Sequence, residues 1–150
     1  MTNRYNHNSF IIREYRKEDF SGISQLWVIT ELSNTKRGDD EKSIEDSIRL
    51  GGSLLVMEEK STEKICGTSW MTFDGRRIHL HHFGISPEFQ GKGFSKILLK
   101  ASLDLVKKRG QQVKLEVHKT NKKAINLYKK YGFKSLGDYK IYIIRDIAKL

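Results

Sequence analysis

The stretch that most constrains the fold covers residues 83–110, which read as the end of a strand, a glycine-bearing turn and a long helix. Gly91 and Gly93 allow a tight turn, so consecutive N–H groups at a helix start can point at one anion. Apolar residues then recur at helical spacing, at Phe94, Ile97, Leu98, Ala101 and Leu105, and Gly110 follows as a stop signal. This geometry suits a diphosphate, although glycines that only relieve strain give the same pattern.

The pattern along the whole chain predicts a mixed sheet with helices on both faces. Strands are expected over residues 10–15, 53–58, 65–73, 77–85 and 112–118, with a final hairpin over residues 134–147. Helices are expected over residues 17–32 and 40–50, between the glycine turn and Gly110, and over residues 121–131. The fold class is therefore α/β (α+β), with about seven strands and about four helices.

Length, hydropathy and cysteine content set further bounds. The 150 residues suit one domain with an adequate core, so we expect a single domain over residues 1–150. No apolar run approaches the ~20 residues that cross a bilayer, and the polar start MTNRYNHNS is unlike a signal peptide. The lone Cys66 excludes an internal disulfide and fits a reducing cytosol. We expect a cytoplasmic protein with no membrane partner.

Two stretches on either side of the predicted long helix carry a family resemblance. Ile85-Ser86-Pro87-Glu88-Phe89 leads directly into the turn, and NKKAINLYKKYGF follows at residues 121–133. Together they resemble the GNAT superfamily of N-acetyltransferases. Its phosphate-loop signature, Gln/Arg-x-x-Gly-x-Gly/Ala, is met at Gln90, Gly93 and, loosely, Ser95. Its later Asn…Ala…Tyr…Gly-Phe pattern is met at Asn121, Ala124, Tyr128, Gly132 and Phe133.

The resemblance implies a GNAT-type, largely antiparallel sheet and acetyl-CoA as cosubstrate, with no metal. The residues that it assigns to acetyl-CoA are Phe83, Gly84, Ile85, Gln90, Gly91, Lys92, Gly93, Phe94, Ser95, Asn121 and Tyr128. Main-chain amides of the turn would grip the diphosphate. The backbone at Phe83 and Ile85 would pair with the pantetheine arm like another strand and supply an oxyanion donor, with ordinary ladder pairing as the alternative. Ser95 departs from the family's Gly or Ala, which predicts tighter packing rather than loss of binding.

Acyl transfer to an amine needs a proton acceptor, because an alkyl ammonium has a pKa near ~10 in water. Period-two alternation puts Lys114, Glu116 and His118 on one face of the expected strand. The stretch LEVHKTNKKAINLYKKYGF resembles a bacterial subgroup that acetylates the N-terminus of a ribosomal protein, in which this strand glutamate is the base. The resemblance thus assigns Glu116 as general base. A surface glutamate, a histidine of strand four or a water chain remain alternatives.

The departing thiolate also benefits from a proton, and the resemblance assigns Tyr128 as the general acid. Tyr128 lies in an apolar helical stripe, so a core tyrosine is the alternative. The side chain of Asn121 would bond the pantetheine arm, or cap the following helix. Both roles of Asn121 can coexist.

Two other phosphate-binding motifs are excluded by the residues present. A Rossmann site needs a third small residue where Lys96 stands, and hairpins precede the turn in place of a βαβ unit. A Walker loop needs Gly-Lys-Ser/Thr four residues after a glycine, and the chain has none.

The net charge of +10 is unevenly spread, since residues 1–75 carry a net −3 and residues 76–150 a net +13. A basic half suits coenzyme A phosphates, a solvated surface or nucleic acid. The alternative function is therefore a basic GNAT-fold binding module for nucleic acid or another anionic partner, without catalysis. The chain lacks an aromatic-and-Arg platform that grips bases, which argues against it.

The remaining candidate groups point to ordinary structural roles. Alternation would place His82 opposite His79 and His81, which argues against a metal site. Cys66 lies in a predicted strand with no activator, so we expect it in the core. The acid-rich residues 39–46 would steer a cationic amine or form a solvated helix face. The sequence is compatible with a small-molecule amine or a peptide or protein amine as the acceptor. It is also compatible with a homodimer.

Overall fold

The computed structural model describes residues 7–32 and 38–150. The chain divides into two compact units, residues 1–116 and 117–150, and each is described by itself. The expectation of a single domain over the whole chain stays a prediction.

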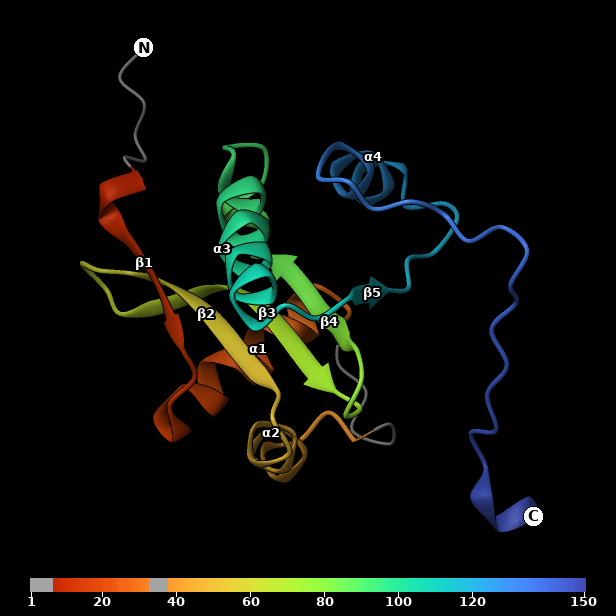
Figure 1. Ribbon diagram of the computed structural model, residues 1–150. Coiled ribbons are helices and arrows are strands. Elements are labelled where there is room, and N and C mark those ends of the chain that lie inside the picture. Colours follow the sequence, from red (N-terminus) through yellow and green to blue (C-terminus); the bar gives the residue numbers. More distant parts are fainter. Residues whose placement is uncertain (1–6, 33–37) are drawn as a thin grey trace. The chain divides into compact units, whose positions relative to one another are not determined.

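The first unit is built on a five-stranded sheet in the order β1-β2-β3-β4-β5 (Figure 1). Its strands are β1 (Phe10–Glu14), β2 (Ser53–Glu59), β3 (Lys64–Phe73), β4 (Ile78–Ile85) and β5 (Val113–Leu115). The first four strands are antiparallel neighbours, and only β5 runs parallel to its partner β4. The mixed, largely antiparallel sheet expected from the sequence is confirmed.

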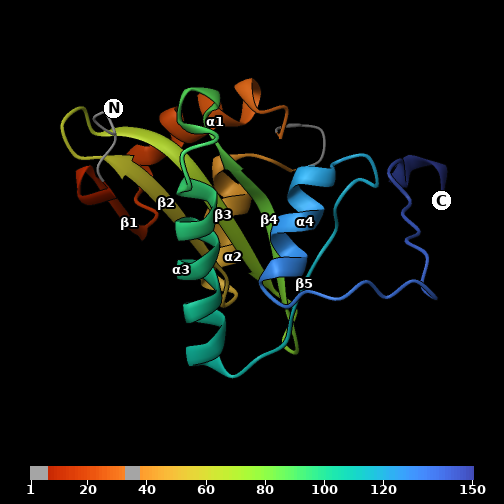
Figure 2. The same cartoon turned by 90° about the horizontal axis from the view of Figure 1, so that it is seen from above.

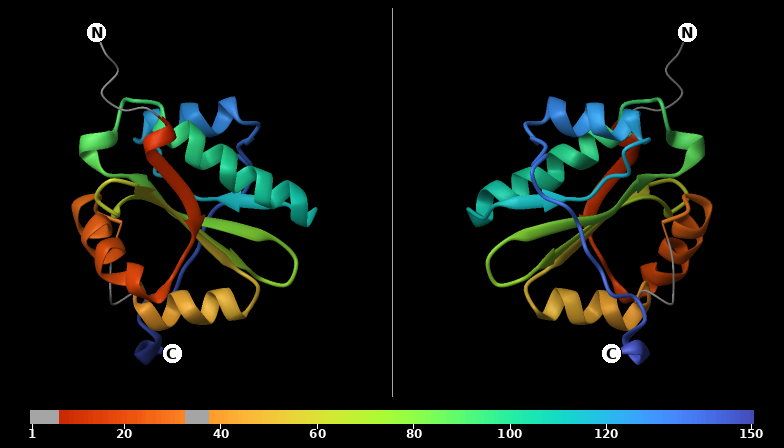
Figure 3. Two further views of the ribbon diagram at one scale, coloured as in Figure 1. Left: turned by 90° about the vertical axis from the view of Figure 1, so that its left-hand side faces the viewer. Right: turned by 90° about the vertical axis from the view of Figure 1, so that its right-hand side faces the viewer.

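Helices cover both faces of this sheet (Figure 3). Neighbouring residues of β3 point to opposite faces and identify the helices there. Ser69 Oγ lies 2.7 Å from Ser102 Oγ of α3 (Phe94–Arg109). Trp70 Nε1 donates to Ser47 Oγ of α2 (Glu41–Arg49) at 2.8 Å, on the face that α1 (Phe20–Ile29) also covers.

The core beneath α1 and α2 is centred on two tryptophans. The Trp27 and Trp70 rings are stacked with centroids 5.6 Å apart. Trp27 is fully buried, and its Nε1 donates to Thr68 Oγ1 at 2.9 Å, so its one polar group is satisfied. The other buried members of this cluster are Ile23, Leu26, Ile44, Leu54, Val56 and Ile65.

The helix α3 lies on the opposite face of the sheet (Figure 2). Its buried side chains recur with a period of about four residues. Its buried side chains are Phe94, Leu98, Leu99, Ser102 and Val106, whereas the expected Ile97, Ala101 and Leu105 are half-buried at the margin. The predicted stop at Gly110 is confirmed, because this residue has φ 66° and its N–H donates to Val106 and Lys107 carbonyls.

The second unit contains α4 (Lys122–Lys130) and a short 3₁₀ turn (Ile147–Lys149). The hairpin predicted over residues 134–147 is wrong, since these residues form no strand, and the described sheet has five strands rather than seven. The side chains of Ile141 and Ile143 are exposed. Alternating apolar residues supply a strand-like face, but a strand also requires a partner for its backbone amides, and the pattern does not specify one.

A buried ion network fixes the start of α1 against the sheet. Arg13 donates to both carboxylate oxygens of Asp19 at 2.8 Å, and it also binds Glu58. Burial opposes ionisation of Asp19, but hydrogen bonds from Arg13 and from the Arg16 N–H outweigh it, so the pKa of Asp19 is lowered. A lowered carboxyl pKa means that the charged form stabilises the fold.

Replacing Asp19 by Asn should therefore lower the free energy of unfolding by about 3 kcal/mol at pH 7, because Arg13 keeps its burial and loses a charged partner. The Asp19 contribution is complete above the unfolded pKa of ~3.9 and is lost as pH falls through the lower folded pKa. Urea unfolding should thus show a smaller acid-induced loss in Asp19→Asn than in the wild type. Asp104→Asn, which breaks an exposed pair with Lys100, is the control and should cost less than about 0.5 kcal/mol. Equal effects of the two substitutions would contradict this assignment.

Candidate functional site

The turn between β4 and α3 has the left-handed backbone that its glycines allow. Gly91 has φ 73° and Gly93, the residue before α3, has φ 84°. A Cβ at Gly91 would meet no atom within 4 Å, so the backbone angle rather than crowding favours glycine there. Gln90 Nε2 donates to the Ile85 carbonyl at 2.8 Å and ties the turn to the end of β4.

The side chain of Phe94 anchors the first turn of α3 in the core. It is buried, and its ring centroid lies 4.4 Å from that of Phe10 and 6.1 Å from that of Phe89. Because the first N–H groups of a helix have no intrahelical acceptor, they carry partial positive charge at this end. Lys92 and Lys96 add basic side chains, both exposed, to the same turn. The residues present therefore fit a diphosphate group.

A bulge at His82 separates the two halves of β4. Trp70 pairs with His81 and Thr68 with Gly84, so the register between β3 and β4 shifts by one residue. His82 has φ 41°, and its carbonyl accepts a 2.8 Å hydrogen bond from Thr68 Oγ1. This bond holds the strand in a conformation that residues other than glycine rarely adopt.

The strand β5 accompanies only the first half of β4. Their pairing ends at Leu80 and Leu115, whereas β4 continues to Ile85 and into the glycine turn. The prediction that residues 112–118 form a strand is wrong beyond Leu115, and Glu116 lies directly after β5 rather than on it. The next partner in this register would be His81, directly before the bulge at His82, so the pairing with β5 stops where β4 becomes irregular.

The predicted separation of the three strand-four histidines is also wrong. The ring of His82 lies 4.4 Å from that of Trp27 and 5.2 Å from that of Trp70, on the α1 and α2 face. His81 also meets Trp70 on this face, at 6.2 Å between ring centroids. The bulge adds one residue and thereby reverses the alternation that the sequence predicts. Among the described residues, no group of three potential ligands is arranged to hold a metal ion.

Glu116 lies next to a histidine of β4. Lys114 pairs with His79, whereas Glu116 and His118, which were predicted to share the face of Lys114, lie beyond the last paired residue of β5. Glu116 Oε1 lies 4.0 Å from His79 Nε2, and the Glu116 side chain is 52% exposed. This contact could not be predicted from the sequence, because the two residues are far apart along the chain.

The imidazoles next to Glu116 are partly buried and ordered. His79 and His81 stack with centroids 3.9 Å apart, and His81 Nε2 lies 2.8 Å from Thr72 Oγ1. Burial lowers the pKa of His79, and burial next to His79 and His82 lowers the pKa of His81 to about 4. Both rings are therefore neutral at pH 7.

Asn121 and Tyr128 lie in the second unit. Asn121 caps α4, since its side chain accepts a 3.2 Å hydrogen bond from the Ala124 N–H, as one of the two expected roles requires. The Tyr128 ring packs edge-on against Phe133 at 5.6 Å, and burial raises its pKa to about 12. The hydroxyl is consequently protonated at neutral pH. The acetyl-CoA contacts assigned to both residues stay predictions.

The acid-rich segment serves the local structure. Asp40 caps α2 by accepting from the Ser43 N–H at 2.8 Å, and Asp46 is paired with Lys42 and Arg49. Asp39 is buried with Oδ1 3.0 Å from His82 Nε2. These contacts favour a capped and solvated helix over a surface that steers cations.

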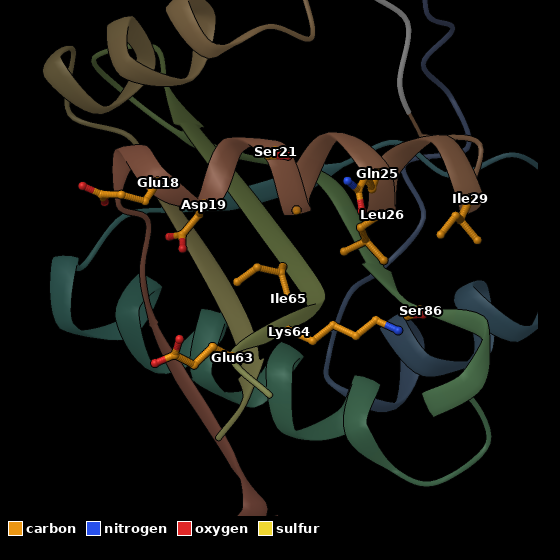
Figure 4. A pocket seen from close by; sticks show the side chains of 11 residues that line it. Glu18, Asp19, Ser21, Gln25, Leu26, Ile29, Glu63, Lys64, Ile65 and Ser86 are labelled. Atoms are coloured by element: carbon orange, nitrogen blue, oxygen red, sulfur yellow. The ribbon is translucent and has the colours of Figure 1, made fainter. Parts of the chain in front are cut away.

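A separate cleft of about 340 Å³ lies between α1 and the start of β3 (Figure 4). Glu18, Asp19 and Glu63 line it, together with Lys64. Asp19 is bound by Arg13, and Lys64 is paired with Glu88. None of the residues assigned to acetyl-CoA or to catalysis lines this cleft.

Comparison with known proteins agrees with this geometry. Residues 11–133 match the model of the Acetyltransferase (GNAT) family. The chain belongs to this family. It is therefore an N-acetyltransferase, and the resemblance stated from its motifs is confirmed.

Three relatives of this GNAT acetyltransferase illustrate its likeness to known members. Thialysine N-epsilon-acetyltransferase of Sus scrofa is 31% identical over an aligned length of 150 positions, and the alignment covers 87% of this chain and 87% of that one. An acetyltransferase from Streptococcus agalactiae shares the fold with a TM-score of 0.77 at 18% identity, covering 91% of this chain and 92% of that one. AAC(6')-Iy, whose structure holds the bisubstrate analogue CoA-S-monomethyl-acetylneamine, gives 0.70 at 12% identity, with coverages of 91% and 97%.

Two remaining expectations concern the membrane and Cys66. No helix in the described part of this acetyltransferase is long and apolar enough to cross a membrane. The expected core position of Cys66 is confirmed, since it is fully buried and its Sγ donates to the Met57 carbonyl at 3.3 Å.

The thiol of Cys66 should resist alkylation in the folded enzyme. Burial raises its pKa to about 12, so almost no reactive thiolate forms at pH 8. Labelling with iodoacetamide, followed by mass spectrometry, should proceed at least about a hundredfold more slowly in buffer than in 8 M urea. Comparable rates in the two solutions would contradict a core position.

Proposed function

We propose that the chain transfers the acetyl group of acetyl-CoA to a primary amine, by direct attack on the thioester within a ternary complex. The observation that carries this proposal is the second half of β4, which continues past the end of β5 and enters a glycine turn at the start of α3. An open strand edge is thus followed, a few residues later, by a helix N-terminus. The strand edge can form backbone hydrogen bonds with the extended pantetheine arm, and the helix N-terminus can bind the diphosphate at its end.

The turn is proposed to bind the diphosphate of acetyl-CoA through main-chain amides from Gln90 to Ser95. Helix N-termini favour anions, and the two left-handed glycines bring the backbone close to them. The backbone of Phe83 and Ile85 is proposed to pair with the pantetheine arm, with Gly84 between them. Gly84 allows the side chain of Leu32 to pack closely against this strand, because a Cβ at residue 84 would lie only 2.9 Å from Leu32.

Glu116 is proposed as the general base and Tyr128 as the general acid. The Glu116 carboxylate lies 4.0 Å from His79 Nε2 and is 52% exposed, so an incoming amine can reach it. Tyr128 keeps its proton at neutral pH, as donation to the departing sulfur requires. Asn121 is proposed to contact the pantetheine arm while it caps α4.

The acceptor is proposed to be a primary amine of a small molecule or of a peptide or protein. Support comes from a relative named for acetylation of a side-chain ε-nitrogen, the thialysine enzyme of Sus scrofa. The acetyl-CoA requirement is shared by the family to which the chain belongs.

Substitution of Gly93 by Asp should abolish acetyl-CoA binding, because it adds a negative charge and a strained Cβ where the diphosphate would lie. Isothermal titration calorimetry should show at least about a hundredfold weaker binding, equivalent to ~2.7 kcal/mol. Gly75→Asp is the matched control, since Gly75 has φ 90° in the β3–β4 turn, and it should bind like the wild type. Binding of an oligonucleotide but not of acetyl-CoA by the wild type would favour the non-catalytic alternative.

Glu116→Gln and Tyr128→Phe should each lower kcat by about 10²–10⁴-fold, the usual effect of losing a general base or acid. The assay follows release of free thiol from acetyl-CoA with polyamine, aminoglycoside and peptide amines. Glu63→Gln and Tyr139→Phe, both at exposed positions, are matched controls with unchanged rates. Full activity of either site variant would remove the role assigned to that residue.

A further inference from the structure

We propose that His79 is a second catalytic residue, and that its Nε2 and Glu116 Oε1 together bind the nitrogen of the acceptor ammonium group. This inference rests on the proposed function and changes one role in it: His79 receives the proton, while Glu116 binds the ammonium group and stabilises the imidazolium that forms. The resulting site recognises a primary ammonium through one carboxylate and one neutral imidazole.

The distance between the two acceptors suits a single bridging nitrogen. Glu116 Oε1 and His79 Nε2 lie 4.0 Å apart, which is too far for a hydrogen bond between them. One nitrogen placed about 2.9 Å from each atom spans this gap with ordinary hydrogen bonds. A primary ammonium has three N–H donors, so two can serve these acceptors while the remaining bond directions stay available.

Packing fixes the imidazole before any substrate arrives. His79 stacks on His81 at 3.9 Å, and His81 is held by Thr72 at 2.8 Å. The backbone of His79 is paired on both sides, with Thr72 of β3 and Lys114 of β5. A catalytic group held by a rigid sheet needs little reorganisation in the reaction.

The charges around His79 suit a neutral proton acceptor beside an anion. Burial is the largest influence and lowers the pKa of His79, Glu116 and Asp74 raise it, and Lys114 lowers it. The neighbouring His81 is neutral at pH 7. His79 therefore starts as a base, and Glu116 stabilises the imidazolium that forms after proton transfer.

The proposed step conserves atoms and charge. An N–H bond of the ammonium breaks, and an N–H bond forms at His79 Nε2. The freed lone pair of the amine attacks the thioester carbonyl carbon, and the C–S bond breaks. Tyr128, the proposed general acid, protonates the departing sulfur, and the second proton that the nitrogen loses restores the phenol through solvent. The imidazolium then returns its proton to water, so the products are an acetamide, free coenzyme A and one proton.

The first test is a histidine side-chain NMR titration of the full chain, which needs no acceptor. In Glu116→Gln, the midpoint of the His79 titration should fall by about half a pH unit or more, because an anion 4.0 Å away is removed. Lys114→Gln, which removes a cation that lowers the pKa of His79, is the matched control and should shift the His79 midpoint in the opposite direction. An unchanged His79 midpoint would overturn the pairing.

The second test measures pH profiles of kcat/KM with spermidine and with a lysine-containing peptide. His79→Gln should lower kcat by at least about tenfold, and the double variant with Glu116→Gln should be scarcely slower than the worse single variant, since the two residues act as one unit. The acid limb of Glu116→Gln should move to lower pH, a change that a merely structural role would not produce. Melting temperature and acetyl-CoA binding should stay unchanged in each variant.

The outcomes separate this inference from the proposed function. Wild-type turnover combined with a fully active His79→Gln variant would overturn the role of His79 and leave the acetyltransferase reaction intact. If the fold-decreases in kcat of the two single variants multiplied in the double variant, the joint role of His79 and Glu116 would also be overturned. No binding of acetyl-CoA by the wild type would instead refute the proposed function.

Discussion

The geometry of the site depends on the hydrogen bond from Thr68 to the carbonyl of His82. Thr68 is fully buried, and its hydroxyl accepts from Trp27 while it donates to His82. One side chain thus links the core tryptophan of α1 to the bulge in β4. Loss of that hydroxyl would leave two buried polar groups unsatisfied, at about 1–3 kcal/mol each. The strain at His82 persists because the surrounding core specifies it.

This distortion determines what surrounds the reacting groups. It ends the pairing with β5 at Leu115, so Glu116 leaves the sheet while still facing His79. It also places His82 on the same face as His79 and His81, opposite α3. The glycine turn follows on the same strand. The bulge therefore lies between the part of β4 that pairs with β5 and the part proposed to bind the acyl carrier, and it brings His82 to the face of His79 and His81.

The sequence predicted those structural features that depend on residues close together along the chain. Asp40 and Gly110 mark the ends of their helices because capping depends on a few adjacent residues. The glycine turn and its helix were likewise predictable from spacing, as was the family resemblance. The bulge at His82 was not predictable in this way, because it depends on a hydrogen bond with Thr68, a residue on the neighbouring strand. For the same reason, alternation placed His82 on the wrong face. Alternation also predicted a hairpin near the C-terminus, because the pattern does not show whether a strand has a partner for its backbone amides.

Hydrogen–deuterium exchange with and without acetyl-CoA tests the central claim most directly. The claim is that the second half of β4 and the following turn bind the acyl carrier through their backbone amides. The account predicts slower exchange over residues 83–95 when acetyl-CoA is bound, with little change in β1 and β2. Tight binding of acetyl-CoA without protection of residues 83–95 would contradict it.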